Sequence, residues 1–247
     1  MGPVIALISL LERRTRLALV QDTGLVLRIR KFAESDLIVT LFTDKWGKRT
    51  AIAKRARRLN SRMGGVFDLL NQVEVVFYEK LGLDLVSQGS LIQGFPRLKS
   101  NLETVSIALS SGRLLDRLLP SCQPERQVYA LFSLFLKVLE SGDVPMDQLQ
   151  TSFTMKALTL LGHRPHLSSC LKCGATRDSF SFIAHRGGVL CPKCSQGRGI
   201  PVSRGLLLSL ESLLRFSLPR AGVVHLSSKD IQLTNEILTS YANFISP

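Results

Sequence analysis

The sequence has few acidic residues, no long apolar run and none of the common nucleotide-binding or nucleophile motifs. Only 19 aspartates and glutamates accompany 32 lysines and arginines in 247 residues, so the formal net charge is +13. No apolar run reaches the roughly 20 residues of a membrane-spanning helix, so we expect no membrane span. Walker A, G-x-G-x-x-G and G-x-S-x-G patterns are absent, and the carboxylates are too scattered for a two-metal nuclease. These absences argue against an enzyme, and the charge excess predicts an anionic partner.

The apolar stretch at residues 4–11 does not have the order of a secretory signal. Arg13, Arg14 and Arg16 follow it, whereas a signal peptide places its positive charge before the apolar run. We therefore expect a cytoplasmic protein, in a compartment that keeps thiols reduced. We assign no role to residues 1–20.

Residues 24–92 predict five short strands, because apolar and polar residues alternate between turn signals. The expected strands are 24–30, 37–43, 50–56, 72–78 and 84–92. Five strands in about seventy residues are typical of a small barrel such as the OB-fold, and an SH3-like barrel fits nearly as well.

From residue 100 the apolar period becomes helical. Ser100 and Glu103 have the spacing of a capping box, which predicts a helix start there. Further amphipathic segments lie at 124–142, 145–161, 205–216 and 229–244.

The sequence therefore predicts an α+β protein with two domains. We expect a five-stranded OB-fold domain for nucleic acid over residues 21–98. A helical domain should follow over residues 99–247 and contain a zinc segment at 166–200.

Four of the five cysteines form two C-x2-C pairs with 17 residues between them. They are Cys170, Cys173, Cys191 and Cys194. This spacing is typical of a four-cysteine zinc site, in which each pair makes a tight turn that presents two thiolates to one tetrahedral ion. The intervening residues can form a hairpin that joins the pairs. We predict a structural Zn²⁺, since four thiolates leave no open coordination position.

Other roles for the cysteines compete with structural zinc. An iron–sulfur cluster also uses four thiolates, so it stays open at this point. Disulfides require an oxidising compartment, a redox pair requires a βαβ unit, and a zinc deaminase requires an H-x-E motif that this chain lacks. His163 or His166 could replace one cysteine as a ligand. Cys122 has no neighbouring partner in the sequence and is interpreted as an ordinary thiol.

A basic segment, KWGKRTAIAKRARRLNSR, covers residues 45–62 and contains eight cations and no acid. Such a row can follow a phosphate backbone and release counterions, and Trp46 could stack on a base, whereas Phe42 fits the core better. No base-reading helix is evident, so we expect binding that is independent of base sequence.

A second basic group lies in the cysteine segment. It could extend a nucleic-acid surface, bind an acidic peptide, or only cover a small core. Its members are Lys172, Arg177, Arg186, Lys193, Arg198 and Arg204.

Two stretches together resemble the RecO family of bacterial DNA repair proteins. Residues 25–65, LVLRIRKFAESDLIVTLFTDKWGKRTAIAKRARRLNSRMGG, are similar to the family's N-terminal OB-fold. The segment LLGHRPHLSSCLKCG…GGVLCPKC is similar to its zinc-binding segment within a helical domain. The resemblance covers roughly residues 22–245 in the family's order. One departure is Arg55, which stands where many members have glycine.

The resemblance implies a recombination mediator located at the nucleoid. Such proteins bind single- and double-stranded DNA and anneal complementary strands without ATP. They engage the acidic C-terminal tail of single-stranded DNA-binding protein and, with RecR, help load RecA in the RecF pathway. Carried over by position, the implied DNA surface is Lys48, Arg49, Lys54, Arg55, Arg57, Arg58 and Arg62, and the implied metal ligands are Cys170, Cys173, Cys191 and Cys194.

The alternative from another class is a zinc-ribbon and OB-fold factor that binds RNA or acts in transcription. It shares the basic segment, the metal and the lack of catalytic groups. It should prefer RNA and fail to anneal DNA.

Overall fold

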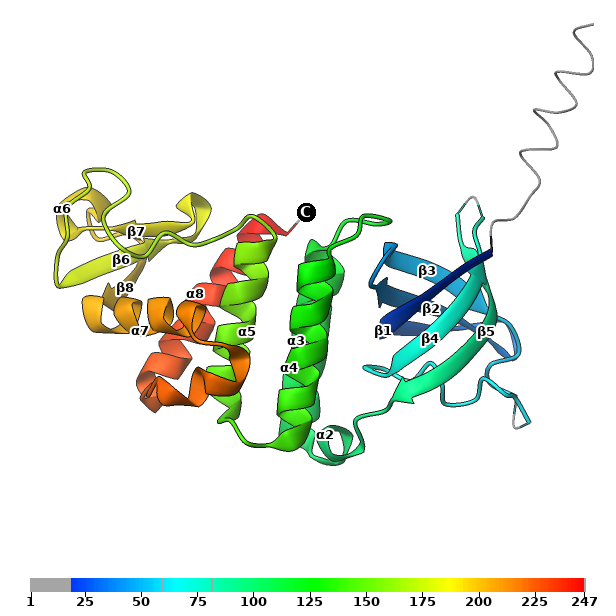
Figure 1. Cartoon of the computed structure of the whole chain (residues 1–247). Coiled ribbons are helices and arrows are strands. Elements are labelled where there is room, and N and C mark those ends of the chain that lie inside the picture. The colour runs from blue at the N-terminus through cyan, green and yellow to red at the C-terminus, as the bar shows by residue number, and fades with distance from the viewer. Residues whose placement is uncertain (1–18, 59, 81, 247) are drawn as a thin grey trace, which may run out of the picture. The chain divides into compact units, whose positions relative to one another are not determined.

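The computed structural model describes residues 19–58, 60–80 and 82–246, which form two compact units (Figure 1). The first unit consists of the residues up to Gly94 together with the segment Pro120–Pro124. The second unit consists of Phe95–Leu119 and the residues from Glu125 onward. Among the helices of the described part, none is long and apolar enough to cross a bilayer.

The first unit is a closed five-stranded barrel, drawn from blue to cyan in Figure 1. Its strands are β1 (Leu19–Phe32), β2 (Asp36–Thr43), β3 (Gly47–Ala53), β4 (Gln72–Tyr78) and β5 (Asp84–Gln93). They follow the order β1-β2-β3-β5-β4, and only the β3–β5 pairing is parallel. This is the OB-fold that the alternation predicts.

Alternation of side chains explains why these residues close into a barrel. On β3 every second residue from Gly47 to Ala53 is buried, as expected for a strand with one face on a core. Val39, Ala51, Val73 and Phe77 meet in that core with almost no exposed surface. Each buried valine or phenylalanine side chain contributes roughly 1.5–3 kcal/mol of transfer free energy.

Strand β1 starts earlier than the alternation predicts, at Leu19 rather than residue 24. Its first part pairs with β4 and its second part with β2, so one long strand serves two neighbours. The sequence conceals this because Asp22 interrupts the apolar pattern. Asp22 is nonetheless buried, and its carboxylate accepts hydrogen bonds from the backbone N–H groups of Thr23 and Lys45 at 2.8 Å.

The connection from β3 to β4 contains turns and no helix among its described residues. Phe67 lies within this connection, is buried, and packs where β5 carries Gly89. A Cβ atom added at Gly89 would lie 2.6 Å from the Phe67 ring, so glycine is needed to seat the ring. The packing holds the second half of this connection against the barrel.

A buried ion pair joins β3 to β5 next to their short parallel ladder. The guanidinium of Arg49 donates to both carboxylate oxygens of Asp84, at 2.8 and 2.9 Å, and also to Glu79 at 3.1 Å. It lies over the Phe77 ring at 5.3 Å and donates to the Cys122 sulfur at 3.4 Å. Burial alone lowers the pKa of Arg49, but Asp84 outweighs it and the pKa is raised. Arg49 is therefore a fixed cation of the barrel interior.

The segment Pro120–Pro124 returns to the barrel from the helical part of the sequence. Cys122 donates its backbone N–H to the Lys48 carbonyl at 2.9 Å. A Cβ atom added at Gly47, which has φ +70°, would lie only 2.0 Å from the Gln123 carbonyl oxygen. Cys122 is a free thiol, as interpreted from the sequence, and its sulfur accepts a hydrogen bond from Arg49, which is 73 residues away along the chain.

The second unit begins with four helices. They are α2 (Pro96–Ser100), α3 (Leu102–Leu118), α4 (Arg126–Ser141) and α5 (Met146–Leu160). Phe132 and Phe135 of α4 pack on Phe153 of α5, with ring centroids 5.6 and 4.4 Å away. This aromatic cluster is the core that the amphipathic pattern predicts for α4 and α5.

The start of α3 differs from the expected capping box. Asn101, not Ser100, is the N-cap, and its side chain accepts from the backbone N–H groups of Glu103 and Thr104. The Ser100 hydroxyl instead donates to the Arg97 carbonyl, because Ser100 ends the short helix α2. Asparagine satisfies the free N–H groups as well as serine does.

The cysteine segment contains β6 (Ser179–Ile183), η1 (Ala184–Arg186), β7 (Gly188–Leu190), α6 (Pro192–Ser195) and β8 (Ile200–Ser203). Strands β6 and β7 form the expected hairpin, which is confirmed by their antiparallel register. Strand β8 adds an edge strand to β6. The sequence did not indicate β8, because it is four residues long and contains a proline.

Two helices complete the second unit, α7 (Arg204–Arg215) and α8 (Ser228–Ile245), with η2 (Leu218–Val223) between them. Figure 1 shows them in orange and red beside the yellow cysteine segment. Tyr241 of α8 packs edge-on against Phe182 of β6 at 5.8 Å. The sheet of the cysteine segment is thus attached to the helices through side chains that are buried.

Replacing Arg49 with alanine should strongly destabilise the barrel. The change leaves Asp84 buried without its cation, which costs about 3–5 kcal/mol in comparable buried pairs. Urea unfolding should show a loss of that order. The matched control is Arg55→Ala, an exposed arginine in the following loop, which should change stability by about 0.5 kcal/mol or less. Equal stability of the two variants would contradict the structural role of Arg49.

Candidate nucleic-acid interface and metal centre

The loop after β3 presents most of the basic segment to solvent. Exposed side chains occupy five of the positions implied for DNA binding, which are Lys54, Arg55, Arg57, Arg58 and Arg62. Lys48 is half-buried on β3. We call the five exposed residues the basic loop.

The basic loop is fixed to the turn between β1 and β2 by backbone hydrogen bonds. Asp36 accepts from the backbone N–H of Arg55 at 2.7 Å. The Ser35 carbonyl accepts from the backbone N–H of Arg57 at 2.9 Å, and the Glu34 carbonyl accepts from its guanidinium at 3.0 Å. These contacts hold the loop while the side chains of Arg55 and Arg58 extend from it.

Arg55 has a left-handed backbone with φ +56°. Glycine adopts this conformation without cost, whereas a residue with a Cβ atom pays on the order of 1 kcal/mol. The departure at Arg55 thus falls on the one residue of the basic loop whose conformation favours glycine. The chain keeps a cation there despite the strain.

The outer face of β1, β2 and β3 adds two arginines that the sequence analysis did not single out. Arg28 and Arg30 of β1 are exposed and pair across the ladder with Thr40 and Ile38. Residues opposite each other in a ladder project from the same face, and the intervening Val39 projects into the barrel core. The signal was available in the L-x-L-R-x-R alternation, which puts both arginines outside. This outer face is where OB-folds bind oligonucleotides.

Arg49 lies apart from these exposed cations. Its side chain is in phase with Ala51 on the inner face of β3 and is engaged by Asp84. We therefore leave Arg49 out of the proposed nucleic-acid surface.

The aromatic residues divide as the strand pattern suggests. Phe42 is fully buried, so it cannot stack on a base. Trp46 and Phe32 expose 41% and 44% of their surface and can provide flat apolar contacts beside the cations.

The four cysteines of the two pairs come together in one cluster. Their sulfur atoms all lie within 4.8 Å of one another. The first pair is shaped by a tight turn, in which Gly174 at φ +70° donates its N–H to the Cys170 carbonyl at 2.8 Å. The second pair spans the start of α6, where the Cys191 carbonyl accepts from the N–H of Cys194 at 2.9 Å. The β6–β7 hairpin carries the second pair to the first.

Backbone contacts also hold the first pair to β7. The N–H of Leu171 donates to the Val189 carbonyl at 2.9 Å, and the N–H of Val189 donates to the His166 carbonyl at 3.1 Å. A Cβ atom at Gly188 would meet the His166 carbonyl oxygen at 2.7 Å. Backbone hydrogen bonds between the first cysteine pair and β7 therefore fix the position of the cluster.

The cluster fits a tetrahedral metal ion. The sulfurs of Cys173 and Cys191 are 3.7 Å apart, and a tetrahedral ion with bonds of about 2.3 Å requires about 3.8 Å between sulfurs. All four cysteines are free thiols here, so the cluster does not consist of disulfides. The spacing suits a metal ion of the size of zinc.

The thiol pKa values show why a cation belongs in the cluster. Burial raises the pKa of Cys170, but the backbone N–H groups of Cys191, Cys173 and Lys172 outweigh burial and lower it to about 6. The hydrogen bond with Cys191, burial and the other nearby sulfurs raise the pKa of Cys194 to about 12. Four thiolates at this distance require a positive ion between them, and one divalent cation supplies that charge.

The histidines considered as replacement ligands do not join the cluster. The described group of possible ligands consists of the four cysteines alone. His166 instead shares a hydrogen bond of 3.1 Å with the Ser169 hydroxyl.

Comparison with known families agrees with this architecture. Residues 17–95 match the family described as "Recombination protein O N terminal", and residues 99–244 match "Recombination protein O C terminal". The chain belongs to the RecO family. The two matched regions correspond to the barrel and the helical part with its cysteine segment.

Individual relatives cover between 73% and 91% of the chain. DNA repair protein RecO of Symbiobacterium thermophilum is 32% identical over 231 residues, which is 91% of each chain. RecO of Anaeromyxobacter sp. (strain K) is 31% identical over 90% of this chain and 89% of its own. RecO of Desulfitobacterium hafniense is 33% identical over 73% and 67%. Family membership favours a role in DNA repair over the RNA-binding alternative.

Removing one thiol of the cluster should abolish metal binding. In Cys194→Ser the fourth ligand is lost, so the purified full chain should retain less than about a tenth of the metal bound by the unchanged chain. Elemental analysis measures the metal and identifies it. Cobalt(II) substitution should give the visible absorption of tetrahedral thiolate coordination.

Cys122→Ser is the matched control, because Cys122 is the cysteine outside the cluster. It should keep one metal ion per chain. Equal metal content in both variants would show that the cluster is not the metal site.

Proposed function

We propose that this RecO-family chain is a non-catalytic recombination mediator in DNA repair. It binds single- and double-stranded DNA, anneals complementary strands without ATP and, with RecR, helps load RecA onto DNA coated by single-stranded DNA-binding protein. Its work takes place in the cytoplasm, at the nucleoid.

The observation that carries the proposal is the basic loop beside the outer face of β1–β3. Arg55, Arg58 and Arg62 are exposed and have no ion-pair partner within the described residues. Arg28 and Arg30 continue the positive surface onto β1. No acidic side chain interrupts the sequence from Lys45 to Arg62. A polyanion gains most from such a surface, because it releases many condensed counterions at once.

The chemistry required of this surface is electrostatic. Two complementary strands repel each other through their phosphates, and a row of fixed cations reduces that repulsion. Lys54, Arg55, Arg57, Arg58, Arg62 and Lys48 are the proposed DNA contacts, together with Arg28 and Arg30. Contacts of this kind go to phosphates and carry no base information, so pairing is left to the strands themselves.

We propose a structural Zn²⁺ held by Cys170, Cys173, Cys191 and Cys194. The ion cross-links the two cysteine pairs and so stabilises a segment whose own apolar core is small. Four thiolates complete its coordination, so no position is left for a reacting water. This arrangement supports the non-enzymatic assignment.

We propose that the barrel domain, residues 21–98, handles DNA and that the helical domain, residues 99–247, meets protein partners. The helical domain is the candidate for the acidic C-terminal tail of single-stranded DNA-binding protein. Opposite charges across that contact would speed association and select the partner.

Charge reversal of the basic loop should weaken DNA binding and flatten its salt dependence. In Arg55→Glu/Arg58→Glu/Arg62→Glu three phosphate contacts are lost, so the slope of log K against log salt should fall in magnitude by about 2 for single strands. Fluorescence titration of a labelled oligonucleotide across a salt series measures both quantities.

The matched control reverses three exposed cations elsewhere, in Arg117→Glu/Arg215→Glu/Lys229→Glu, and should keep most of the slope. An unchanged affinity and slope in the loop variant, with an intact fold by circular dichroism, would contradict the assignment of the DNA surface.

A further inference from the structure

The cysteine segment contains a pocket to which the proposed DNA binding by the barrel assigns no role. Its volume is about 120 Å³, and it lies beside the cysteine cluster. The lining residues are Lys172, Ile183, His185, Arg186, Leu190, Cys194, Ser195, Gln196 and Arg198. Three of these are lysine or arginine and none is acidic.

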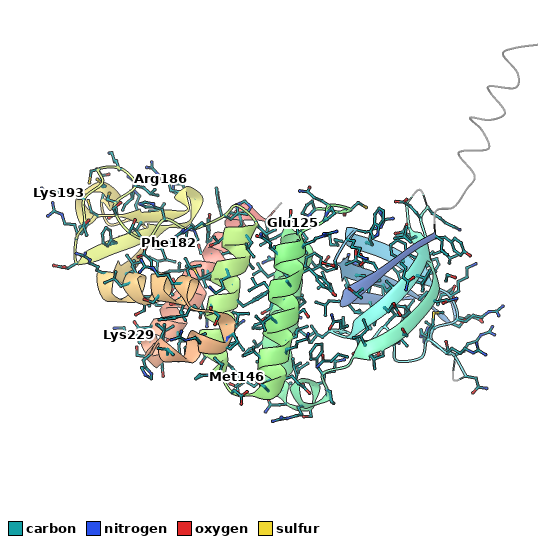
Figure 2. All side chains as sticks on the ribbon, viewed as in Figure 1. Glu125, Met146, Phe182, Arg186, Lys193 and Lys229 are labelled. Atoms are coloured by element: carbon teal, nitrogen blue, oxygen red, sulfur yellow. The ribbon has the colours of Figure 1, made fainter. Side chains whose placement is uncertain are left out.

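The cations around the pocket come from three separate turns of the chain. Lys172 lies inside the first cysteine pair, Arg186 lies in η1 between β6 and β7, and Arg198 follows α6. Figure 2 labels Arg186, together with Lys193, on the cysteine segment. Residues far apart in the sequence thus bring positive charge to one small opening.

One of these cations is held in place. The guanidinium of Arg198 donates to the Gln196 side-chain oxygen at 3.0 Å and to the Ser195 carbonyl at 3.4 Å. Lys172 and Arg186 are exposed and have no ion pair among the residues that the structure describes. Their charges are therefore available to a ligand.

The metal alone does not account for this charge. Residues 170–204 contain six lysines and arginines and one acid, Asp178, which gives +5. A divalent ion with four thiolates carries a net charge of −2. The net charge of the segment with its metal cluster is then +3, so positive charge remains after the charge of the cluster has been included.

The residues that line the pocket favour phosphate over an acidic peptide. Peptide sites gain most of their affinity from apolar anchors, but Ile183 and Leu190 are only 6% and 5% exposed. Two guanidinium groups, from Arg186 and Arg198, instead suit the paired oxygens of a phosphate. Arg177, Lys193 and Arg204 lie in the same segment and extend the charge beyond one anion.

We propose that this pocket is a second nucleic-acid site, in which Lys172, Arg186 and Arg198 bind backbone phosphates of a strand separate from the one held on the barrel. The inference rests on the proposed function, because it gives the annealing chain a place for each strand. The second site is independent of base sequence, as the first is.

Counting bound short oligonucleotides tests the proposal directly. A strand of eight thymidines is comparable to the site size of one OB-fold, about 4–16 nucleotides, so one oligonucleotide should fill one site. The metal-loaded full chain should bind two per chain at low salt by isothermal titration. Lys172→Glu/Arg186→Glu should bind one, with the second site weakened at least about tenfold. The loop variant Arg55→Glu/Arg58→Glu/Arg62→Glu should also bind one, and the combined variant should bind none.

Two further variants keep the test decisive. Lys172→Gln/Arg186→Gln removes the charges without placing carboxylates near the cluster, and it should also lose the second oligonucleotide while keeping its metal. Arg215→Glu/Lys229→Glu makes the same charge change as the pocket double variant on α7 and α8 and should still bind two.

The possible failures differ from one another. One oligonucleotide on the unchanged chain, lost only in the loop variant, would overturn the second site and leave the proposed function standing. No binding by the unchanged chain would overturn both. Displacement by inorganic phosphate at matched ionic strength, or pocket variants that lose only a polyglutamate peptide, would make the pocket a small-anion or peptide site and overturn the proposal.

Discussion

The buried pair of Arg49 and Asp84 is the interaction on which the barrel surface depends. Strands β3 and β5 share only two register pairs, Ala51 with Asp84 and Ile52 with Leu85, so their parallel ladder is short. The ion pair adds two charge-assisted hydrogen bonds at that closure, in an interior where they are strong. The basic loop starts directly after β3. If the barrel opened between β3 and β5, strand β3 would no longer hold the start of the basic loop in place. The buried Arg49 therefore supports the position of the exposed arginines of the basic loop.

Much of this architecture could be predicted, because barrels and cysteine pairs have periodic signatures. Alternation predicted five strands, but β3 covers Gly47–Ala53 rather than 50–56 and β1 starts at Leu19 rather than 24. The pair spacing located the cluster and its hairpin. The ion pair of Arg49 could not be predicted, because its partner Asp84 is 35 residues away and no local pattern reveals the pairing. Asn101 caps α3 in place of the expected Ser100, because Ser100 is the last residue of α2. The sequence pattern did not show that a separate short helix ends there. The pocket of Lys172, Arg186 and Arg198 depends on three turns meeting, which no sequence window contains.

The two basic regions have different physical origins. On the barrel, the cations extend from a regular sheet and from a loop fixed by backbone bonds, as in the contact of Arg55 with Asp36. In the cysteine segment, a metal cluster replaces the apolar core that so few residues cannot build. Both solutions hold cations on hydrogen-bonded backbone, which limits the entropy lost when a polyanion binds. The neutral helices between them in the sequence carry the aromatic core of Phe132, Phe135 and Phe153.

The measurement that tests the central claim most directly is annealing on coated DNA. Two complementary strands are each covered with single-stranded DNA-binding protein from the same organism, and the full chain is added without ATP while duplex formation is followed by fluorescence. The account predicts rapid pairing that needs this chain and slows as salt rises. Pairing no faster than in its absence, from a folded and metal-loaded protein, would contradict the claim that this chain is an annealing mediator.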